Sequence, residues 1–272
     1  MNISKLKQSP KVFTRLFGIP PHKFDELVVR IEPLWIKSEQ KRLNHPRKIR
    51  KGGGRPYLLD REQSVAMLLL YARSYVTHIF LSALFDIHDS AICHYFAKLR
   101  PIVEDVFDLP TKKTDLREEE ILKLIVDATE QRTERRNTGS GYSGKKKMQS
   151  IKTQIVVDKQ GNIMHISDSV PGNIHDKKLF DQSAITLPDT ALGDLGYLGT
   201  NLIVPFKSSK LHTLTKPQKR WNTRHSRKRI VVEHVFATLK AFRILADRFR
   251  GALNHYHEYF VIVCGLRNLA RS

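Results

Sequence analysis

Hydrophobic residues in the first part of the chain follow the spacing of amphipathic helices. Residues 9–17 and 22–36 predict two short helices, separated by the Pro20-Pro21 pair. Between residues 60 and 107 the pattern predicts helix, helix, turn and helix, with Asp89 as a candidate cap for the last helix. This part of the chain is therefore expected to be all-α.

The pattern changes after residue 120. The segment "ILKLIVDA" (121–128) is typical of a buried strand, and "KMQSIKTQIVVD" (147–158) alternates with period two. A third strand, "NIMHISDSV" (162–170), follows across the turn "DKQGN". The remaining predicted elements are a helix over 175–183, short strands within 189–197 and 201–207, and helices over 226–245 and 254–271.

Three leading strands form a meander, and the two later strands join it by a helical crossover. This order predicts an α/β fold with a ribonuclease-H-like mixed sheet and flanking helices, preceded by an all-α helix-turn-helix domain. The expected organisation is an N-terminal helical segment (1–40), a basic linker or arm (41–57), a helix-turn-helix DNA-binding domain (58–110) and a ribonuclease-H-like domain with the candidate catalytic acids (118–272).

The formal net charge of +20 and the isoelectric point near 10.0 favour a polyanionic partner, most often nucleic acid. A basic protein without that function is the alternative. Residues 1–58 hold 14 basic and 4 acidic residues (net +10), residues 59–120 hold 7 and 11 (net −4), and residues 121–272 hold 26 and 12 (net +14). Two basic regions thus flank a mildly acidic one.

The two cysteines, Cys93 and Cys264, form no CxxC motif, so neither a disulfide framework nor a thiolate zinc site is supported. No apolar run reaches about 18 residues, and the N-terminus lacks the apolar core of a signal peptide. We therefore expect no membrane partner and a cytoplasmic location.

The segment "KRLNHPRKIRKGGGRP" (41–56) is basic, contains no acid and includes three consecutive glycines. It is either a solvated linker or an arm that lies in an A·T-rich minor groove. In the second case the DNA-contacting residues are Arg47, Lys48, Arg50, Lys51 and Arg55.

The tight spacing of the helices between residues 60 and 107, with Ala83 at the packing point, indicates a helix-turn-helix. A plain helical bundle is the alternative. Residues 59–107 hold only 4 basic residues against 6 acidic ones, so phosphate affinity would come from the flanking arm. The side chains expected to face base edges are Ser90, His94, Tyr95 and Lys98.

Asp127 follows an apolar strand, and Asp194 follows a short one between Gly193 and Gly196. A buried, unpaired carboxylate costs several kcal/mol. Each aspartate is therefore either a solvated residue at a strand end, or a paired or metal-bound one. Asp176 competes for the same role, although the start of a helix would make it a cap.

Glu233 lies in the predicted helix over 226–245. At about 100° per residue it shares a face with Ser226, Arg229, Ala237 and Lys240, away from the core side chains. It is either the partner of Arg229 in a surface pair, worth about 0.3–0.5 kcal/mol, or part of a site. Together with Asp127 and Asp194 it completes three carboxylates on one side of the sheet. Such a cluster suits Mg²⁺ or Mn²⁺, and two ions about 3.5–4 Å apart can cleave a phosphodiester.

The stretches "LIVDATE", "YSGKKKMQSIKTQIVVD", "PGNIHD", "GDLGY" and "RIVVEHVFATLKAF" occur in the order found in DDE-superfamily transposases. The chain resembles bacterial transposases of the insertion-sequence-five group and the related Harbinger-type nucleases over residues 120–245. Residues 58–107 resemble the helix-turn-helix that precedes that nuclease domain, whereas residues 1–40 carry no matching motif.

The resemblance implies a catalytic and metal-binding triad of Asp127, Asp194 and Glu233. It also implies contacts with DNA by Arg229, Lys240 and the loop lysines Lys145, Lys146 and Lys147. In some related enzymes a tyrosine lies three residues before the arginine, but here that residue is Ser226, which puts a tyrosine-specific DNA contact in doubt. Trp221 is either stacked on an unpaired base or anchored on the protein surface.

The implied reaction is metal-dependent nicking of the terminal inverted repeats of an insertion sequence, followed by attack of the new 3′-hydroxyl on target DNA. Its implied partners are double-stranded DNA and a second copy of the chain, in a dimer or higher assembly at the bacterial nucleoid. The alternatives are a domesticated or inactive DNA-binding relative and a ribonuclease of the same fold.

Overall fold

The computed structural model describes residues 1–44, 57–107, 109, 124–134, 142–143, 147–183, 185–209 and 213–272. It divides into two compact units. The first unit contains Met1–Asp108, Phe242–Ile244 and Glu258–Ser272, and the second contains Leu109–Ala241 and Leu245–His257. None of the helices within the described ranges is long and apolar enough to cross a membrane.

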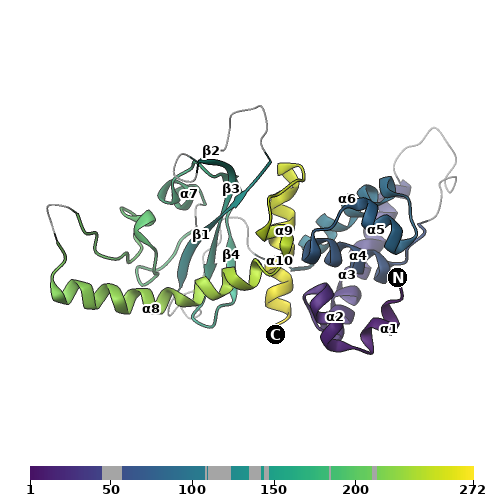
Figure 1. Cartoon of the computed structure of the whole chain (residues 1–272), viewed down its shortest axis with the longest axis horizontal. Coiled ribbons are helices and arrows are strands. Elements are labelled where there is room, and N and C mark those ends of the chain that lie inside the picture. The colour runs from purple at the N-terminus through teal and green to yellow at the C-terminus, as the bar shows by residue number, and fades with distance from the viewer. Residues whose placement is uncertain are drawn as a thin grey trace. The chain divides into compact units, whose positions relative to one another are not determined.

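The first unit is helical, as the sequence predicts (Figure 1). The two-helix pattern near the N-terminus is confirmed, but the second helix continues beyond residue 36 to Asn44. Its polar last turns are held by Glu39, which pairs with both Arg42 and Lys98. The helices are α1 (Ile3–Lys7), α2 (Pro10–Phe17), α3 (Pro21–Asn44), α4 (Arg61–Ser74), α5 (His78–Phe85) and α6 (Asp89–Phe107).

Helices α4, α5 and α6 form the predicted helix-turn-helix arrangement. Asp60 caps α4 in a reciprocal pair with Gln63, and Thr77 caps α5. Asp89 is the first residue of α6, and its carboxylate accepts the N–H of Ser90 at 2.8 Å. The turn between α5 and α6 places Asp86 in the left-handed region at φ 53°.

The C-terminal segment Glu258–Ser272 clusters with this helical unit, which differs from the predicted extent of the second domain (118–272). Its helix α10 (Tyr256–Leu269) contains a buried apolar run from Tyr259 to Cys264. Tyr259 packs against Tyr71, with ring centroids 5.9 Å apart, and the Phe107 ring lies directly on Gly265. The apolar face of α10 therefore completes the helical core, a partnership that local sequence patterns do not reveal.

The second unit is built on a sheet whose central strand is β3. Strand β3 pairs antiparallel with all four other strands, and its register with β1 sets Asp127 opposite Ile155. The strands are β1 (Ile125–Arg132), β2 (Tyr142–Ser143), β3 (Met148–Val157), β4 (Ile163–Ile166) and β5 (Val170–Pro171).

The two later predicted strands are present only as single bridges: Leu192 pairs parallel with Ile125 and with Ile203. The order β4, β3, β1, Leu192, Ile203 is the expected mixed sheet of ribonuclease-H type. The bridges stay short because the chain turns at Asp194 and because Pro205 has no N–H to donate.

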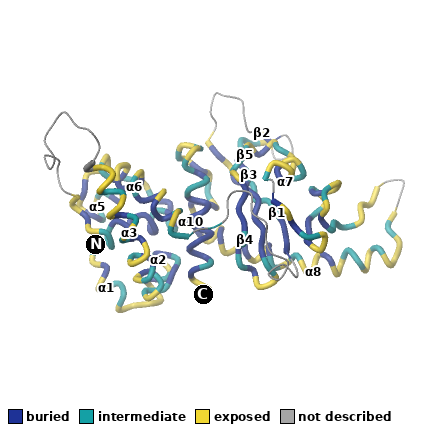
Figure 2. Tube along the Cα trace, turned by 180° about the vertical axis from the view of Figure 1, so that it is seen from behind, coloured by how far each residue is buried: buried dark blue, intermediate teal, exposed yellow. Residues whose placement is uncertain are grey.

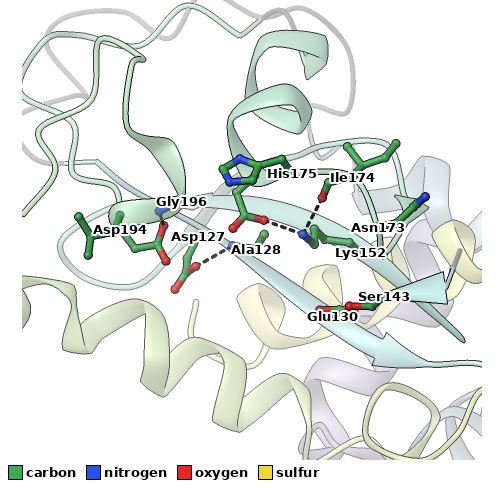
Figure 3. Close-up of a pocket in the computed structure, with 13 residues that line it drawn as sticks. Asp127, Ala128, Glu130, Ser143, Lys152, Asn173, Ile174, His175, Asp194 and Gly196 are labelled. Atoms are coloured by element: carbon green, nitrogen blue, oxygen red, sulfur yellow. Dashed lines mark hydrogen bonds and ion pairs between the residues drawn. The ribbon is translucent and has the colours of Figure 1, made fainter. Parts of the chain in front are cut away.

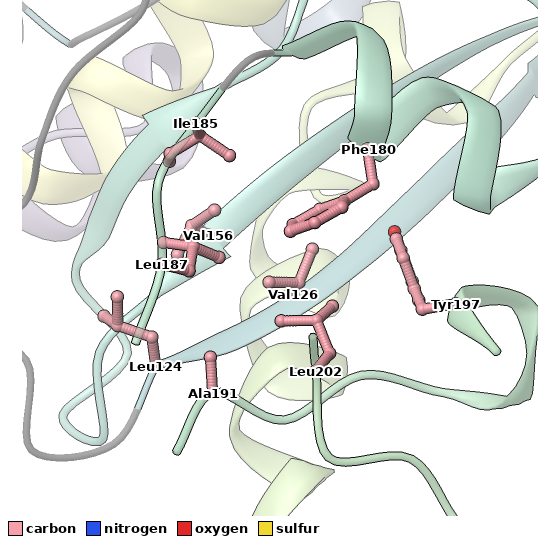
Figure 4. Packing of buried hydrophobic residues seen from close by; sticks show 9 residues of the cluster. All are labelled: Leu124, Val126, Val156, Phe180, Ile185, Leu187, Ala191, Tyr197 and Leu202. Atoms are coloured by element: carbon pink, nitrogen blue, oxygen red, sulfur yellow. The ribbon is translucent and has the colours of Figure 1, made fainter. Parts of the chain in front are cut away.

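One face of this sheet packs on α7 (Asp176–Ser183) and the one-turn helix η2 (Leu195–Tyr197). Figure 4 shows the nine-residue core cluster on this face, which includes Val126 and Val156 of the sheet together with Phe180 and Tyr197. The remaining helices are α8 (Lys216–Leu239), α9 (Arg243–Ala246) and the one-turn η3 (Leu253–His255).

Helix α8 begins ten residues earlier than the predicted helix over 226–245 and ends at Leu239. Thr215 and Gln218 form a capping box, and Pro217 lies in the first turn. Both features favour a helix start at this point. Figure 1 shows α8 running alongside β1, with its amino-terminal end extending past the strands.

Candidate active site

Asp127 is the third residue of β1, and 16% of its side chain is exposed. Its Oδ1 accepts the N–H of Ala128 at 2.8 Å, and its Oδ2 accepts a guanidinium N–H of Arg229 at 2.8 Å. The carboxylate is therefore a paired, mostly buried group, and not a solvated residue at a strand end.

Asp194 follows the Leu192 bridge and caps η2, where its Oδ1 accepts the N–H of Gly196 at 2.8 Å. A Cβ at residue 196 would collide with the carboxylate of Asp176 and would lie 2.9 Å from Oδ1 of Asp194. Glycine is thus required here because two carboxylates occupy the space of a side chain.

Glu233 is exposed on α8. The surface pair between Glu233 and Arg229, which was the alternative to a role in a site, does not form, because Arg229 donates to Asp127. Within the described ranges, Glu233 forms no hydrogen bond or ion pair. Its carboxylate is therefore available to a ligand.

Burial raises the pKa of the Asp127 carboxyl to about 6. The Arg229 guanidinium and the Ala128 N–H lower this pKa, whereas the charges of Asp194 and Glu233 raise it further. The charges of both other predicted acids thus act on the Asp127 carboxyl. Among the described residues, however, no three His, Cys, Asp or Glu side chains converge closely enough to hold a metal ion.

A cavity of about 490 Å³ adjoins Asp127 and Asp194 (Figure 3). Lys152 of β3 lines it and donates to the Ile174 carbonyl at 2.7 Å and to Oδ1 of Asp176 at 2.8 Å. Asp176, which competes with Asp127 and Asp194 for a place in the site, is the first residue of α7, as predicted. Its carboxylate pairs with Lys152. The alternating pattern of β3 gave no signal that Lys152 would face this cavity.

Tyr197, in the "GDLGY" stretch, is fully buried behind the acids. Its hydroxyl has no hydrogen-bond partner among the described residues. Burial raises its pKa well above the ordinary value, and the charges of Asp127, Asp176 and Asp194 act in the same direction. No pattern in the sequence singles out this residue.

Several residues predicted to contact DNA are accessible: His94 on α6, Lys147 and Lys240 are exposed. Lys98 is different, because its ammonium lies over the Trp35 ring, 3.4 Å from the centroid, and pairs with Glu39. Tyr95 is 3% exposed, and its hydroxyl accepts the N–H of Leu59, so it does not face outwards as predicted. Arg47, Lys48, Arg50, Lys51, Arg55, Lys145 and Lys146 lie outside the described residues.

Trp221 packs on the protein surface. It stacks on His225 with ring centroids 5.1 Å apart and meets the edge of Phe206 at 5.2 Å. These contacts correspond to the anchoring alternative for Trp221. Arg229, in turn, has only 14% of its side chain exposed and is engaged by Asp127.

Comparisons with known proteins identify the family to which the chain is related. The family model described as DDE superfamily endonuclease matches residues 126–268, and the model for the helix-turn-helix of DDE superfamily endonuclease matches residues 58–108. The chain is 31% identical to the transposase assigned to insertion sequence element IS702 of Microchaete diplosiphon, over 98% of both chains. It is 27% identical to the one assigned to element IS112 of Streptomyces albus G, over 93% of this chain and 92% of that one.

No solved structure matches the chain significantly. The endonuclease model covers more than half of the chain and spans all three candidate acids, and the first relative matches almost from end to end. The chain therefore belongs to the DDE superfamily endonucleases.

Proposed function

We propose that this protein is the transposase of a bacterial insertion sequence of the insertion-sequence-five group, and that it cleaves and joins DNA with Asp127, Asp194 and Glu233. The observation that carries the proposal is the mostly buried Asp127 carboxyl, whose pKa is raised by burial and by the charges of both other acids. The match of the endonuclease family model over residues 126–268, a span that includes all three acids, supports it. Two full-length relatives assigned to insertion sequences give the substrate class.

The donor chemistry of the three acids fits hard divalent cations. Carboxylate oxygens are the preferred ligands of Mg²⁺ and Mn²⁺. Oδ2 of Asp194 and both oxygens of Glu233 have no partner in the described part of the chain, so they are free to act as ligands. When bound, two such ions would activate the attacking oxygen and stabilise the leaving one.

The residues around the acids orient them. The Ala128 N–H fixes one oxygen of Asp127, and the Gly196 N–H fixes one oxygen of Asp194, so each carboxylate presents its second oxygen in a defined direction. Arg229 holds that second oxygen of Asp127 and so limits the repulsion among the acids. Lys152 similarly neutralises Asp176 at the wall of the cavity.

The decisive experiment is Mg²⁺-dependent cleavage of a duplex carrying the terminal repeat of the element. Asp127→Ala, Asp194→Ala and Glu233→Ala should each lower the rate about 1,000-fold or more, because each removes a ligand that is worth several kcal/mol in the transition state. Undiminished cleavage by any one variant removes that residue from the triad.

Two further variants serve as comparisons. Asp176→Ala should lower the rate much less, because the Asp176 carboxylate is paired with Lys152. Asp181→Asn changes an exposed carboxylate on the same helix, paired with Lys177, and should cleave like the wild type.

A further inference from the structure

The amino-terminal half of α8 carries a row of cations that the proposed triad does not use. We call Lys216, Arg220, Arg224, Arg227 and Lys228 the basic stripe. All five are exposed, and Figure 2 shows this end of α8 mostly in the exposed and intermediate colours. Within the residues that the structure describes, none of the five forms an ion pair or a hydrogen bond through its side chain.

This arrangement is unfavourable for the isolated helix. Lys216, Arg220, Arg224 and Lys228 succeed one another at four-residue spacing, where like charges repel. Cations near a helix amino terminus also oppose the helix dipole, and the first turn of α8 contains no acid. No Asp or Glu occurs anywhere between Asp194 and Glu233. Within the described residues the charge of the stripe is thus not compensated, which indicates an external polyanion.

The stripe is presented on a fixed support. Next to the stripe on α8, Trp221 stacks on His225, and the His225 Nε2 bonds to the Ile203 carbonyl at 3.0 Å. Asn222 accepts the Phe206 N–H at 2.9 Å and donates to the Phe206 carbonyl at 3.0 Å. The helix therefore cannot rotate its cations toward the sheet.

The direction of the stripe separates it from the candidate active site. At about 100° per residue, Arg220, Arg224 and Arg227 point roughly 120–180° away from Glu233 around the helix axis. Arg229, which contacts Asp127, lies only about 40° from Glu233. A phosphate at the acids and a phosphate on the stripe therefore approach α8 from different sides.

We propose that the basic stripe binds the phosphate backbone of a second DNA duplex, distinct from the segment that lies at Asp127, Asp194 and Glu233. The inference rests on the proposed function, and it adds the surface that receives the other DNA. From Lys216 to Lys228 the helix rises about 18 Å, which matches about five base-pair steps of a duplex. The second duplex is either another terminal repeat or unrelated target DNA, since both present the same backbone.

The test measures two reactions on the full-length protein. A complex is first formed on a terminal-repeat duplex, and capture of a fluorescent second duplex is then followed at several salt concentrations. Arg220→Ala/Arg224→Ala should weaken capture about tenfold or more and lower its salt slope by about 1.8, or 0.9 for each lost phosphate contact. Cleavage of the terminal-repeat duplex should stay within about twofold of wild type.

Two controls are matched to this variant. Arg220→Lys/Arg224→Lys keeps both charges and should keep most of the capture, and Lys159→Ala/Lys178→Ala removes two exposed cations elsewhere in the same unit and should capture normally. Capture is measured with second duplexes that carry or lack the terminal repeat, which distinguishes the two sources of DNA. If the variant loses capture of both kinds of duplex, the stripe binds the backbone of either.

The proposal is overturned if Arg220→Ala/Arg224→Ala lowers cleavage as much as capture, because the stripe would then hold the DNA that is cut. It is also overturned if capture is unchanged. Asp127→Asn separates failure of this proposal from failure of the proposed function, because that variant should lose cleavage and retain capture.

Discussion

At the scale of single residues, the candidate site is governed by the low accessibility of Asp127. Its folded pKa of about 6 lies above the ordinary value of 3.8. The folded chain therefore binds this proton more tightly than the unfolded chain, and the stability from this group is present below about pH 3.8 and lost as the pH rises through 6. The difference corresponds to about 3 kcal/mol, so the ionised residue opposes folding at neutral pH.

Asp127→Asn should accordingly abolish cleavage yet stabilise the protein. Because the amide removes a buried charge and can still accept from Arg229, we expect the free energy of unfolding at pH 8 to rise by up to about 3 kcal/mol, and by about half as much at pH 5. Urea unfolding at the two pH values measures this. Asp181→Asn should show no such pH dependence, and an equal gain at both pH values would contradict the proposed origin.

Tyr197 gives a second prediction of the same kind. An unpaired buried hydroxyl costs about 1–3 kcal/mol, so Tyr197→Phe should raise the free energy of unfolding by at least about 1 kcal/mol. Tyr259→Phe is the matched control, because the Tyr259 hydroxyl is equally buried but accepts a hydrogen bond from Arg100 at 3.4 Å. Tyr259→Phe should lower the free energy of unfolding. If Tyr197→Phe lowers it as well, the Tyr197 hydroxyl is paired.

At the scale of elements, the sequence predicted most helices and strands but not all of their limits. The period-two pattern around Ile151–Val157 fixed β3, and the apolar run before Asp127 fixed β1. The start of α8 was missed although Thr215, Pro217 and Gln218 carry a capping signal, because the basic residues that follow give no apolar periodicity. Leu192 and Ile203 form bridges too short for any pattern to define.

The anchoring of α8 leads to a prediction about its amino-terminal half. Trp221→Ala removes the stacking on His225 and the contact with Phe206, so hydrogen exchange over residues 216–226 should become faster. Trp221→Phe keeps part of both contacts and should show a smaller change. If exchange in this segment is unaffected, Trp221 is free to stack on a base instead.

At the scale of the whole molecule, the chain carries a net charge of +20 and belongs to the DDE superfamily endonucleases. The net charge predicted a polyanionic partner, and the order of the motifs along the chain predicted the family and the three candidate acids. It could not reveal that Arg229 pairs with Asp127, or that Lys152 pairs with Asp176, because these residues are 102 and 24 positions apart and meet only in the folded chain.

The charge predicts a steep salt dependence of DNA binding. If six or more phosphates are contacted, affinity for a terminal-repeat duplex should fall about 1,000-fold or more between 50 and 200 mM salt. Fluorescence anisotropy across this range gives the slope directly. A nearly flat slope would mean that the basic residues do not contact the backbone and would contradict the DNA-binding part of the proposal.

The position of Glu258–Ser272 in the helical unit has a consequence for biosynthesis. The helix-turn-helix leaves the ribosome early, but the apolar residues Phe260 to Cys264 that complete its core are translated only after the second unit has been made. A nascent or prematurely terminated chain therefore exposes an unfinished hydrophobic surface where the mature protein has a closed unit. Truncated products should be recognised by chaperones and proteases, and so would not compete with the full-length protein for its DNA.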